Sequence, residues 1–288
     1  MIADVSIEDR ISESYSGLSA KLKDAADFVV ANQLDVATRS LRSISANSSL
    51  SPATFSRLAR SLGFESYEEL RELCREAMDH RRTSWSDRAQ RLQEEPNASS
   101  AMLDRHTSAC VTNLTEMAQK IDQERLSTAV DTIAKARRVI LFGAFSSTGV
   151  AEYMAYLSQF FASNWQIAGR MGASLGSTIA ELRSEDVLLI VTKTPYARRA
   201  VTAAEMAKEI GAKVVVITDS HTCPTNRYGD FSFIVPSESP QFFSSYVATM
   251  ALLETMIAML VAQSGDEAST KIRDVEARNK RLGDFWAE

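Results

Sequence analysis

The chain has 288 residues, of which 45% are hydrophobic and 24% charged, and its formal net charge is −5. This composition excludes a disordered chain, and the length predicts about two domains of roughly 150 residues each. The acidic balance excludes a protein that coats nucleic acid through overall positive charge, although it allows one basic face on an acidic chain.

The cysteines and the apolar segments indicate the environment of the protein. Cys74, Cys110 and Cys223 lie too far apart for a zinc pattern or a disulfide framework, which predicts no metal site and a reducing cytoplasm. The first residues hold no apolar leader, and the longest near-apolar stretch, 247–262, is shorter than the roughly 20 residues that cross a bilayer. We therefore expect a cytoplasmic protein without a membrane segment.

The pattern of apolar residues changes twice along the chain. Residues 1–80 show only helical spacing, which predicts an all-α domain. Residues 81–110 are rich in polar residues and are expected to form a linker or an inter-domain helix. From residue 111 to 288, short apolar runs alternate with helical patterns, which predicts an α/β doubly wound domain with a parallel sheet.

The elements expected in this second domain can be placed by residue. Strands are predicted at 139–142, 187–191, 214–218 and 231–235. Helices are predicted at 148–161, 198–210 and 243–263, and a charged helix is predicted in the tail from 267 to 282.

One segment of the first domain carries strong signals for a capped helix. Ser51 suits the N-cap, Pro52 the first helical position and Gly63 the end, which predicts a helix of about eleven residues. A short turn and another helix, ending near Ala46, are expected before it. Phe55, Leu58 and Leu62 fall on one side of the predicted helix and favour a buried face.

The opposite side of this helix is polar and cationic. Between Asp35 and Glu65 the chain has four arginines and no acidic residue. Hydroxyl groups and arginine can contact base edges in a major groove, while other arginines hold phosphates. The alternative is a small bundle with a solvated arginine face. The candidate DNA-binding residues are Arg42, Ser51, Thr54, Ser56, Arg57 and Arg60.

This stretch resembles the N-terminal domain of the RpiR family of bacterial transcription regulators. The matching positions are Leu50, Ser51, Thr54, Arg57, Arg60 and Leu62-Gly63-Phe64, and Ser66–Leu70 continues the pattern. Ser45 replaces the usual small Ala at a helix–helix contact, and Ser49 replaces the Gly of the turn, where a positive φ would cost a serine a modest energy. The resemblance implies a helix-turn-helix domain, operator DNA as partner, and a homodimer or homotetramer.

The first strand of the second domain leads into a turn of small residues before a helix. Ser146 and Ser147 in this turn could present hydroxyls and amides to an anion, or the turn could serve packing alone. The domain resembles the sugar isomerase (SIS) domain that follows in RpiR regulators, which implies a flavodoxin-like fold and a second loop that holds a sugar phosphate.

The second loop departs from the family pattern. Thr192, Thr194, Pro195 and Ala197 stand where the family has Ser, Ser, Gly and Thr, and Phe145 replaces a Gly in the first loop. Pro195 lacks an N–H donor and Ala197 lacks a hydroxyl, so at least two phosphate donors are lost. Lys193, Arg198 and Arg199 could replace the charge or could simply be solvated. The candidate ligand-binding residues are Ser146, Ser147, Thr192, Lys193, Thr194 and Arg198.

The combination predicts a DNA-binding transcriptional regulator that responds to a small-molecule effector, with no cofactor, metal or catalytic residue. The effector would be a sugar phosphate or another small, acidic or less charged metabolite, unless the domain serves dimerisation alone. One alternative is a sugar-phosphate isomerase, which needs a base beside the sugar carbons and an intact phosphate anchor. The other is a non-catalytic assembly module whose arginine face binds protein.

Overall fold

The computed structural model describes residues 7–82, 85–94, 101–170, 172, 174–284 and 286. The chain forms two compact units, residues 1–98 and 99–288, and each is described by itself. The second unit begins with a helix that runs through residue 110 without a break. The predicted functional boundaries after residues 80 and 110 stay predictions.

The first unit is helical, as its apolar spacing predicts. Phe55 lies at the centre of its core and is fully buried, with edge-on ring contacts to Phe28 at 5.9 Å and Tyr67 at 6.2 Å between centroids. The last helix of the unit lies in the segment predicted as linker. The elements are α1 (Ile7–Ser14), η1 (Tyr15–Gly17), α2 (Ala20–Ala31), α3 (Gln33–Thr38), α4 (Leu41–Ser48), α5 (Pro52–Ser61), α6 (Tyr67–Arg82) and α7 (Trp85–Glu94).

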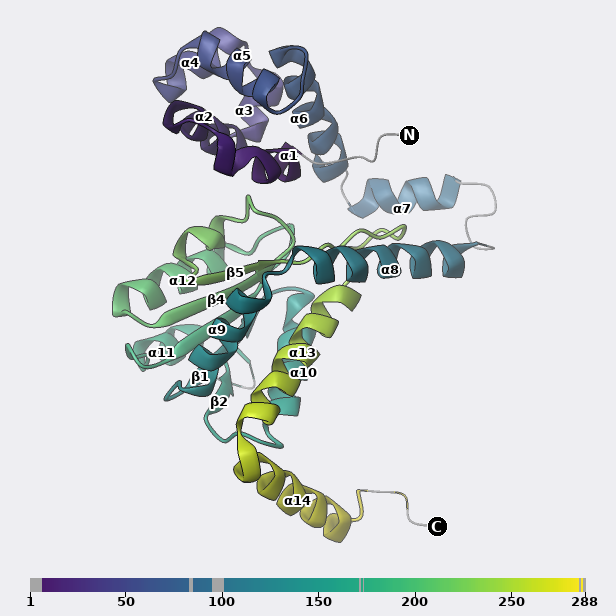
Figure 1. The fold of residues 1–288 in the computed structure, drawn as a ribbon. Coiled ribbons are helices and arrows are strands. Elements are labelled where there is room, and N and C mark those ends of the chain that lie inside the picture. The colour runs from purple at the N-terminus through teal and green to yellow at the C-terminus, as the bar shows by residue number, and fades with distance from the viewer. Residues whose placement is uncertain are drawn as a thin grey trace. The chain divides into compact units, whose positions relative to one another are not determined.

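The second unit is built around a five-stranded sheet in which all strand pairs are parallel (Figure 1). The strand order β2-β1-β3-β4-β5 is that of flavodoxin-like doubly wound folds, so the predicted fold class is confirmed. The elements are α8 (Met102–Lys120), α9 (Gln123–Ala134), β1 (Val139–Gly143), α10 (Ser147–Ser158), β2 (Trp165–Ile167), α11 (Leu175–Ala180), β3 (Val187–Val191), α12 (Arg198–Ile210), β4 (Lys213–Thr218), η2 (Pro224–Tyr228), β5 (Phe231–Ile234), α13 (Val247–Gln263) and α14 (Gly265–Leu282).

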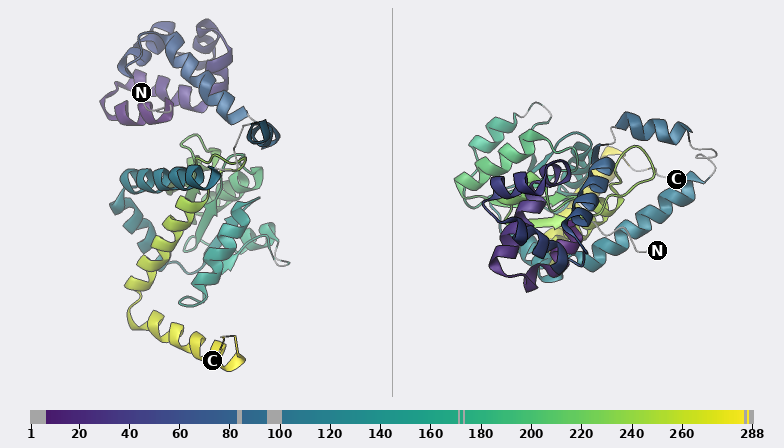
Figure 2. Two further views of the ribbon diagram at one scale, coloured as in Figure 1. Left: turned by 90° about the vertical axis from the view of Figure 1, so that its right-hand side faces the viewer. Right: turned by 90° about the horizontal axis from the view of Figure 1, so that it is seen from above.

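Helices cover both faces of the sheet, because successive strand residues point to opposite sides. Leu141 and Leu189 pack with α9, α10 and α13, whereas Ile140 and Leu188 pack with α11 and α12 (Figures 1 and 2). Continuous apolar strands are therefore buried on both sides. The chain leaves β1 in one direction toward β2 and returns on the other side at β3. The carboxyl ends of β1 and β3 thus form the switch point at which folds of this kind bind ligands.

Several elements differ from the sequence-based expectation, among them α9, for which no helix was predicted. β2 and α11 were not predicted, since runs of three and six residues give little periodic signal. α13 begins at Val247 instead of residue 243, because the backbone N–H of Ser245 bonds to the Ser237 carbonyl at 2.9 Å and keeps the preceding residues in a loop. The predicted charged tail helix is confirmed as α14.

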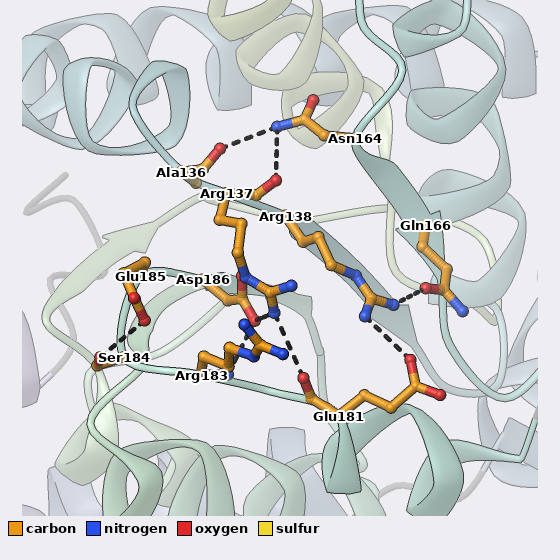
Figure 3. A network of polar contacts seen from close by, with 10 residues as sticks. All are labelled: Ala136, Arg137, Arg138, Asn164, Gln166, Glu181, Arg183, Ser184, Glu185 and Asp186. Carbon is orange, nitrogen blue, oxygen red and sulfur yellow. Dashed lines mark hydrogen bonds and ion pairs between the residues drawn. The ribbon is translucent and has the colours of Figure 1, made fainter.

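Ion pairs fasten the amino ends of β1 and β3 (Figure 3). The side chain of Asp186 is fully buried, and its carboxylate lies 2.5 Å from Nη2 of Arg137 and accepts the backbone N–H of Arg183 at 2.8 Å. Arg138 pairs with Glu181 at 3.0 Å. These contacts hold β1 and β3 together at their amino-terminal ends, opposite the switch point. Within the described residues, no single helix combines the length and apolar composition needed to cross a membrane.

Candidate functional sites

The sequence from α4 to α5 folds into two helices joined by a tight turn. Ser49 adopts the left-handed conformation, with φ of 58°, and so takes the role that glycine usually has at this point. Ser45 donates a hydrogen bond to the Leu50 carbonyl, and this bond closes the turn. Both departures from the family pattern therefore fit the helix-turn-helix geometry.

α5 is capped at both ends as its sequence predicts. The Ser51 hydroxyl accepts the backbone N–H of Thr54 at 3.3 Å. At the other end, Gly63 has φ of 84°, its N–H bonds to the Arg60 carbonyl at 3.1 Å, and the Phe64 N–H bonds to the Ala59 carbonyl at 3.0 Å. This pair of bonds is a Schellman motif. The helix is therefore held by local interactions in addition to its buried face.

The two sides of α5 differ sharply in burial. Phe55 and Leu58 are fully buried, whereas Ser51, Arg57 and Arg60 are exposed and Ser56 is half-buried. Arg42, in α4, is also exposed. Among the described residues, no carboxylate pairs with these three arginines, while Arg39 pairs with Asp35 at 3.0 Å. Their charge is available to an external anion.

The expectation that Thr54 lies on the exposed side is wrong. This side chain is only 4% exposed, and its hydroxyl lies 2.9 Å from that of Ser51. Thr54 therefore supports the N-cap of α5. Two other polar side chains of the helix bond to their own backbone, Ser56 to the Pro52 carbonyl at 3.2 Å and Arg57 through Nε to the Ala53 carbonyl at 3.2 Å.

The first loop at the switch point follows β1. Its Gly143 has no room for a side chain, since a Cβ there would lie 2.2 Å from the Ser147 carbonyl oxygen. Phe145 has φ of 54° and is 66% exposed, so most of its side chain faces solvent. The hydroxyls of Ser146 and Ser147 lie 2.9 Å and 2.8 Å from the hydroxyl of Tyr246.

The second loop, after β3, brings a buried cation to the same place. Lys193 is only 5% exposed, so of the two alternatives left open for this residue the solvated side chain is excluded. Its Nζ donates to the Ser245 carbonyl at 3.3 Å and lies 5.1 Å from the ring centroid of Tyr246. Burial lowers the pKa of Lys193 to about 8, an effect that the negative charge of Asp219 opposes.

The same loop is shaped by Asp219, which follows β4. Its carboxylate accepts the backbone N–H of Thr194 at 3.0 Å, the Thr194 hydroxyl at 3.5 Å and the Tyr196 hydroxyl at 3.1 Å. Thr192 is buried, and its N–H bonds to the Ile217 carbonyl at 3.0 Å, which continues the pairing with β4. Thr192 thus extends the sheet, while Thr194 stays exposed at its edge.

We call Ser146, Ser147, Lys193, Thr194 and Tyr246 the switch-point cluster. Four of these residues were predicted from the sequence, and the structure brings them to one edge of the sheet. Tyr246, with Ser245 and Asp219, was missed. A polar residue directly after a buried strand was the available signal for Asp219, whereas Tyr246 lay inside a predicted helix and gave none.

Arg198 is not part of this cluster. It is exposed and lines a hollow of about 390 Å³ between α11 and α12, together with Ser174, Leu175, Gly176, Ile179, Arg199, Thr202, Ala203 and Met206. No member of the switch-point cluster lines this hollow. The prediction that Arg198 binds the same ligand as Lys193 therefore has no support from the geometry.

Comparisons with known proteins match both units. The sequence model of the helix-turn-helix domain of the rpiR family matches residues 5–78, and that of the SIS domain matches residues 132–259. An HTH-type transcriptional regulator of Haemophilus influenzae is 24% identical over 268 residues, which cover 91% of this chain and 92% of that protein. HexR of Pseudomonas aeruginosa is 22% identical over 273 residues, and the match covers 93% of this chain and 93% of HexR.

Solved structures show the same fold. Vibrio vulnificus NanR, solved as a complex with ManNAc-6P, has a TM-score of 0.58 at 19% identity and covers 96% of this chain and 99% of its own. The sugar isomerase domain of an RpiR transcription factor from Sphaerobacter thermophilus has a TM-score of 0.58 at 23% identity, covering 62% of this chain and 99% of its own. With an rpiR-type helix-turn-helix domain followed by an SIS domain, the chain belongs to the RpiR family of transcriptional regulators.

Proposed function

We propose that this protein is a transcriptional regulator that binds duplex DNA through α5 and senses a small anionic metabolite at the switch-point cluster. The observation that carries the DNA-binding part is the exposed arginine pair of α5, Arg57 and Arg60, which forms no ion pair with any described carboxylate, on a helix whose other side is buried. Since bacterial DNA lies in the cytoplasm, this function also places the protein there.

A single buried ammonium supports the sensing part. Lys193 is desolvated, and the described residues provide one hydrogen-bond acceptor for its three N–H donors. A buried cation with unused donors is costly unless an anion completes its contacts. The exposed Ser146 and Thr194 flank this cation at the open edge of the sheet.

A binding role is favoured over isomerase activity. An isomerase needs a free base beside the sugar carbons. The carboxylate that faces the cluster, Asp219, is instead engaged by the backbone and side chains of its own loop. The relatives named above are also transcriptional regulators.

The proposed partners are operator DNA, one small-molecule effector and further copies of the same chain. A two-fold symmetric oligomer would bind a palindrome with half-sites separated by about one helical turn or a multiple of it. Selection of bound duplexes from a randomised pool by the full-length protein should therefore yield a palindromic consensus. Recovery of random sequences, with no enrichment after repeated rounds, would refute the proposal.

The full-length protein and the selected duplex can also be used to test the response to an effector. Addition of the effector should change the affinity of the protein for the selected duplex, because a ligand can shift the equilibrium only by its differential affinity for the two states. An assay for interconversion of aldose and ketose phosphates separates this proposal from the enzyme alternative. Turnover that depends on Lys193 would favour the enzyme.

A further inference from the structure

The switch-point cluster has few donors for a phosphate group. Pro195 provides no backbone N–H and Ala197 no hydroxyl, where the family pattern has a Gly and a Thr. The two serine hydroxyls that remain are both bonded to the hydroxyl of Tyr246. Ser147 is in addition only 1% exposed. Because the Tyr246 hydroxyl carries a single proton, at least one of the two serines must donate to it, and that serine donor is withheld from a ligand while the contact lasts.

The charge of the cluster also fits a singly charged carboxylate better than a phosphate group. Lys193 contributes one positive charge, and the Asp219 carboxylate stands close enough to influence it. A phosphate monoester carries about −1.5 to −2 at neutral pH, whereas a carboxylate carries one negative charge. With Asp219 already beside the single Lys193 ammonium, each further negative charge of a ligand adds repulsion, so a carboxylate is accommodated at a lower cost than a phosphate.

Tyr246 is held firmly in this position. Its ring packs against the core formed by the sheet with α9, α10 and α13, and the ring face lies over the Lys193 ammonium. The preceding residue, Ser245, accepts the Lys193 hydrogen bond. The loop that leads to both is tied to α8, where the Asn113 side-chain amide donates to the Glu238 carbonyl at 2.8 Å and accepts the Glu238 N–H at 3.2 Å.

We propose that Tyr246 determines the class of effector: with its hydroxyl on Ser146 and Ser147, the site takes a carboxylate of a small polar metabolite, such as a sugar acid, in place of a phosphate. This inference rests on the proposed function of the cluster as the effector site. It names the residue that sets the specificity and the chemical class that is accepted.

The test uses Tyr246→Phe in the full-length protein. Phenylalanine keeps the ring that packs in the core and covers Lys193, and it removes only the hydroxyl that occupies the two serines. Binding is measured by calorimetry with probes that share a sugar skeleton, glucuronate with glucose 6-phosphate and galacturonate with galactose 6-phosphate. The wild-type protein should bind the carboxylate of each pair and bind the phosphate at least about tenfold more weakly.

The substitution should change only the affinity for the phosphate probe of each pair. In Tyr246→Phe the affinity for the phosphate probes should rise by about tenfold, the factor expected for one regained hydrogen bond to a charged group. The affinity for the carboxylate probes should stay within about threefold. Adding Ser146→Ala and Ser147→Ala to Tyr246→Phe should abolish the gain, since these changes remove both hydroxyls that the first substitution released.

Two results would overturn the inference. One is a wild-type protein that binds the phosphate probes as tightly as Tyr246→Phe does, which leaves effector sensing intact but removes Tyr246 as its determinant. The other is the absence of binding of every probe to both proteins, which removes the cluster as a site for sugar-type anions. DNA affinity of the same two proteins without effector reports separately on the proposed function and should be equal in both.

Discussion

The lowered pKa of Lys193 makes effector binding sensitive to pH in a range where an ordinary lysine is fully charged. With a pKa of about 8, the side chain is about 90% protonated at pH 7 and about 10% protonated at pH 9. If only the ammonium pairs with the anion, the affinity for a carboxylate should fall about tenfold between these two values. A solvated lysine would give no change over the same interval.

Calorimetry with glucuronate from pH 6.5 to 9.5 measures this dependence, and Lys193→Met serves as the control. This variant should bind weakly at every pH. The groups near the ammonium are the Asp219 carboxylate and the Tyr246 ring. An affinity that stays constant up to pH 9, or a Lys193→Met variant with the wild-type profile, would refute the role assigned to the buried ammonium.

The same pKa has a consequence for stability. Between pH 8 and 10.5 the unfolded chain binds more protons at this residue than the folded chain does, so the contribution of Lys193 to folding becomes more favourable as the pH rises through that window. At pH 7 the buried charge costs on the order of 3 kcal/mol. Lys193→Met should therefore be at least as stable as the wild type in urea unfolding at pH 7, while losing anion binding. A large loss of stability would contradict this reasoning.

Three further substitutions test separate parts of the structure. Ser51→Ala removes the N-cap of α5 and should lower the unfolding free energy of the first unit by about 1 kcal/mol in urea titration. Gly143→Ala places a Cβ against the Ser147 carbonyl and should lower the unfolding free energy by at least about 2 kcal/mol. Gly149→Ala is the control, since Gly149 has open space around it in α10 and its substitution should not lower the unfolding free energy. Equal effects of the two substitutions would contradict the assigned clash. Asn113→Asp loses its donor to Glu238 and should weaken carboxylate binding by about tenfold in calorimetry, with DNA affinity unchanged in the absence of effector; full retention of binding would separate this loop from the site.

The sequence predicts those features that local interactions determine. The caps of α5 and its buried face depend on residues within one or two turns, so the roles of Ser51 and Phe55 follow from the sequence alone. The parallel sheet could also be predicted, because its long strands are apolar throughout. β2 and α11 are too short for a periodic signal.

The details of the effector site depend on contacts between distant parts of the chain. Tyr246 meets Ser146 across 100 residues of sequence, and the burial of Lys193 depends on the same loop. Neither contact leaves a local pattern. The burial of Thr54 was missed for a related reason, since a threonine next to a buried Phe55 can serve the cap or the exposed face, and only the three-dimensional packing distinguishes the two.

The central claim is that the cationic face of α5 contacts duplex DNA, and titration of a selected duplex across a series of salt concentrations tests it most directly. Arg57→Ala and Arg60→Ala should each lower the affinity by at least about tenfold, and a lost phosphate contact should make the salt dependence shallower by about one unit of slope. Arg273→Ala is the matched control, since this exposed arginine of α14 also bonds through Nε to the carbonyl four residues before it. Wild-type affinity in both α5 variants, or no binding of any duplex at low salt, would contradict the account.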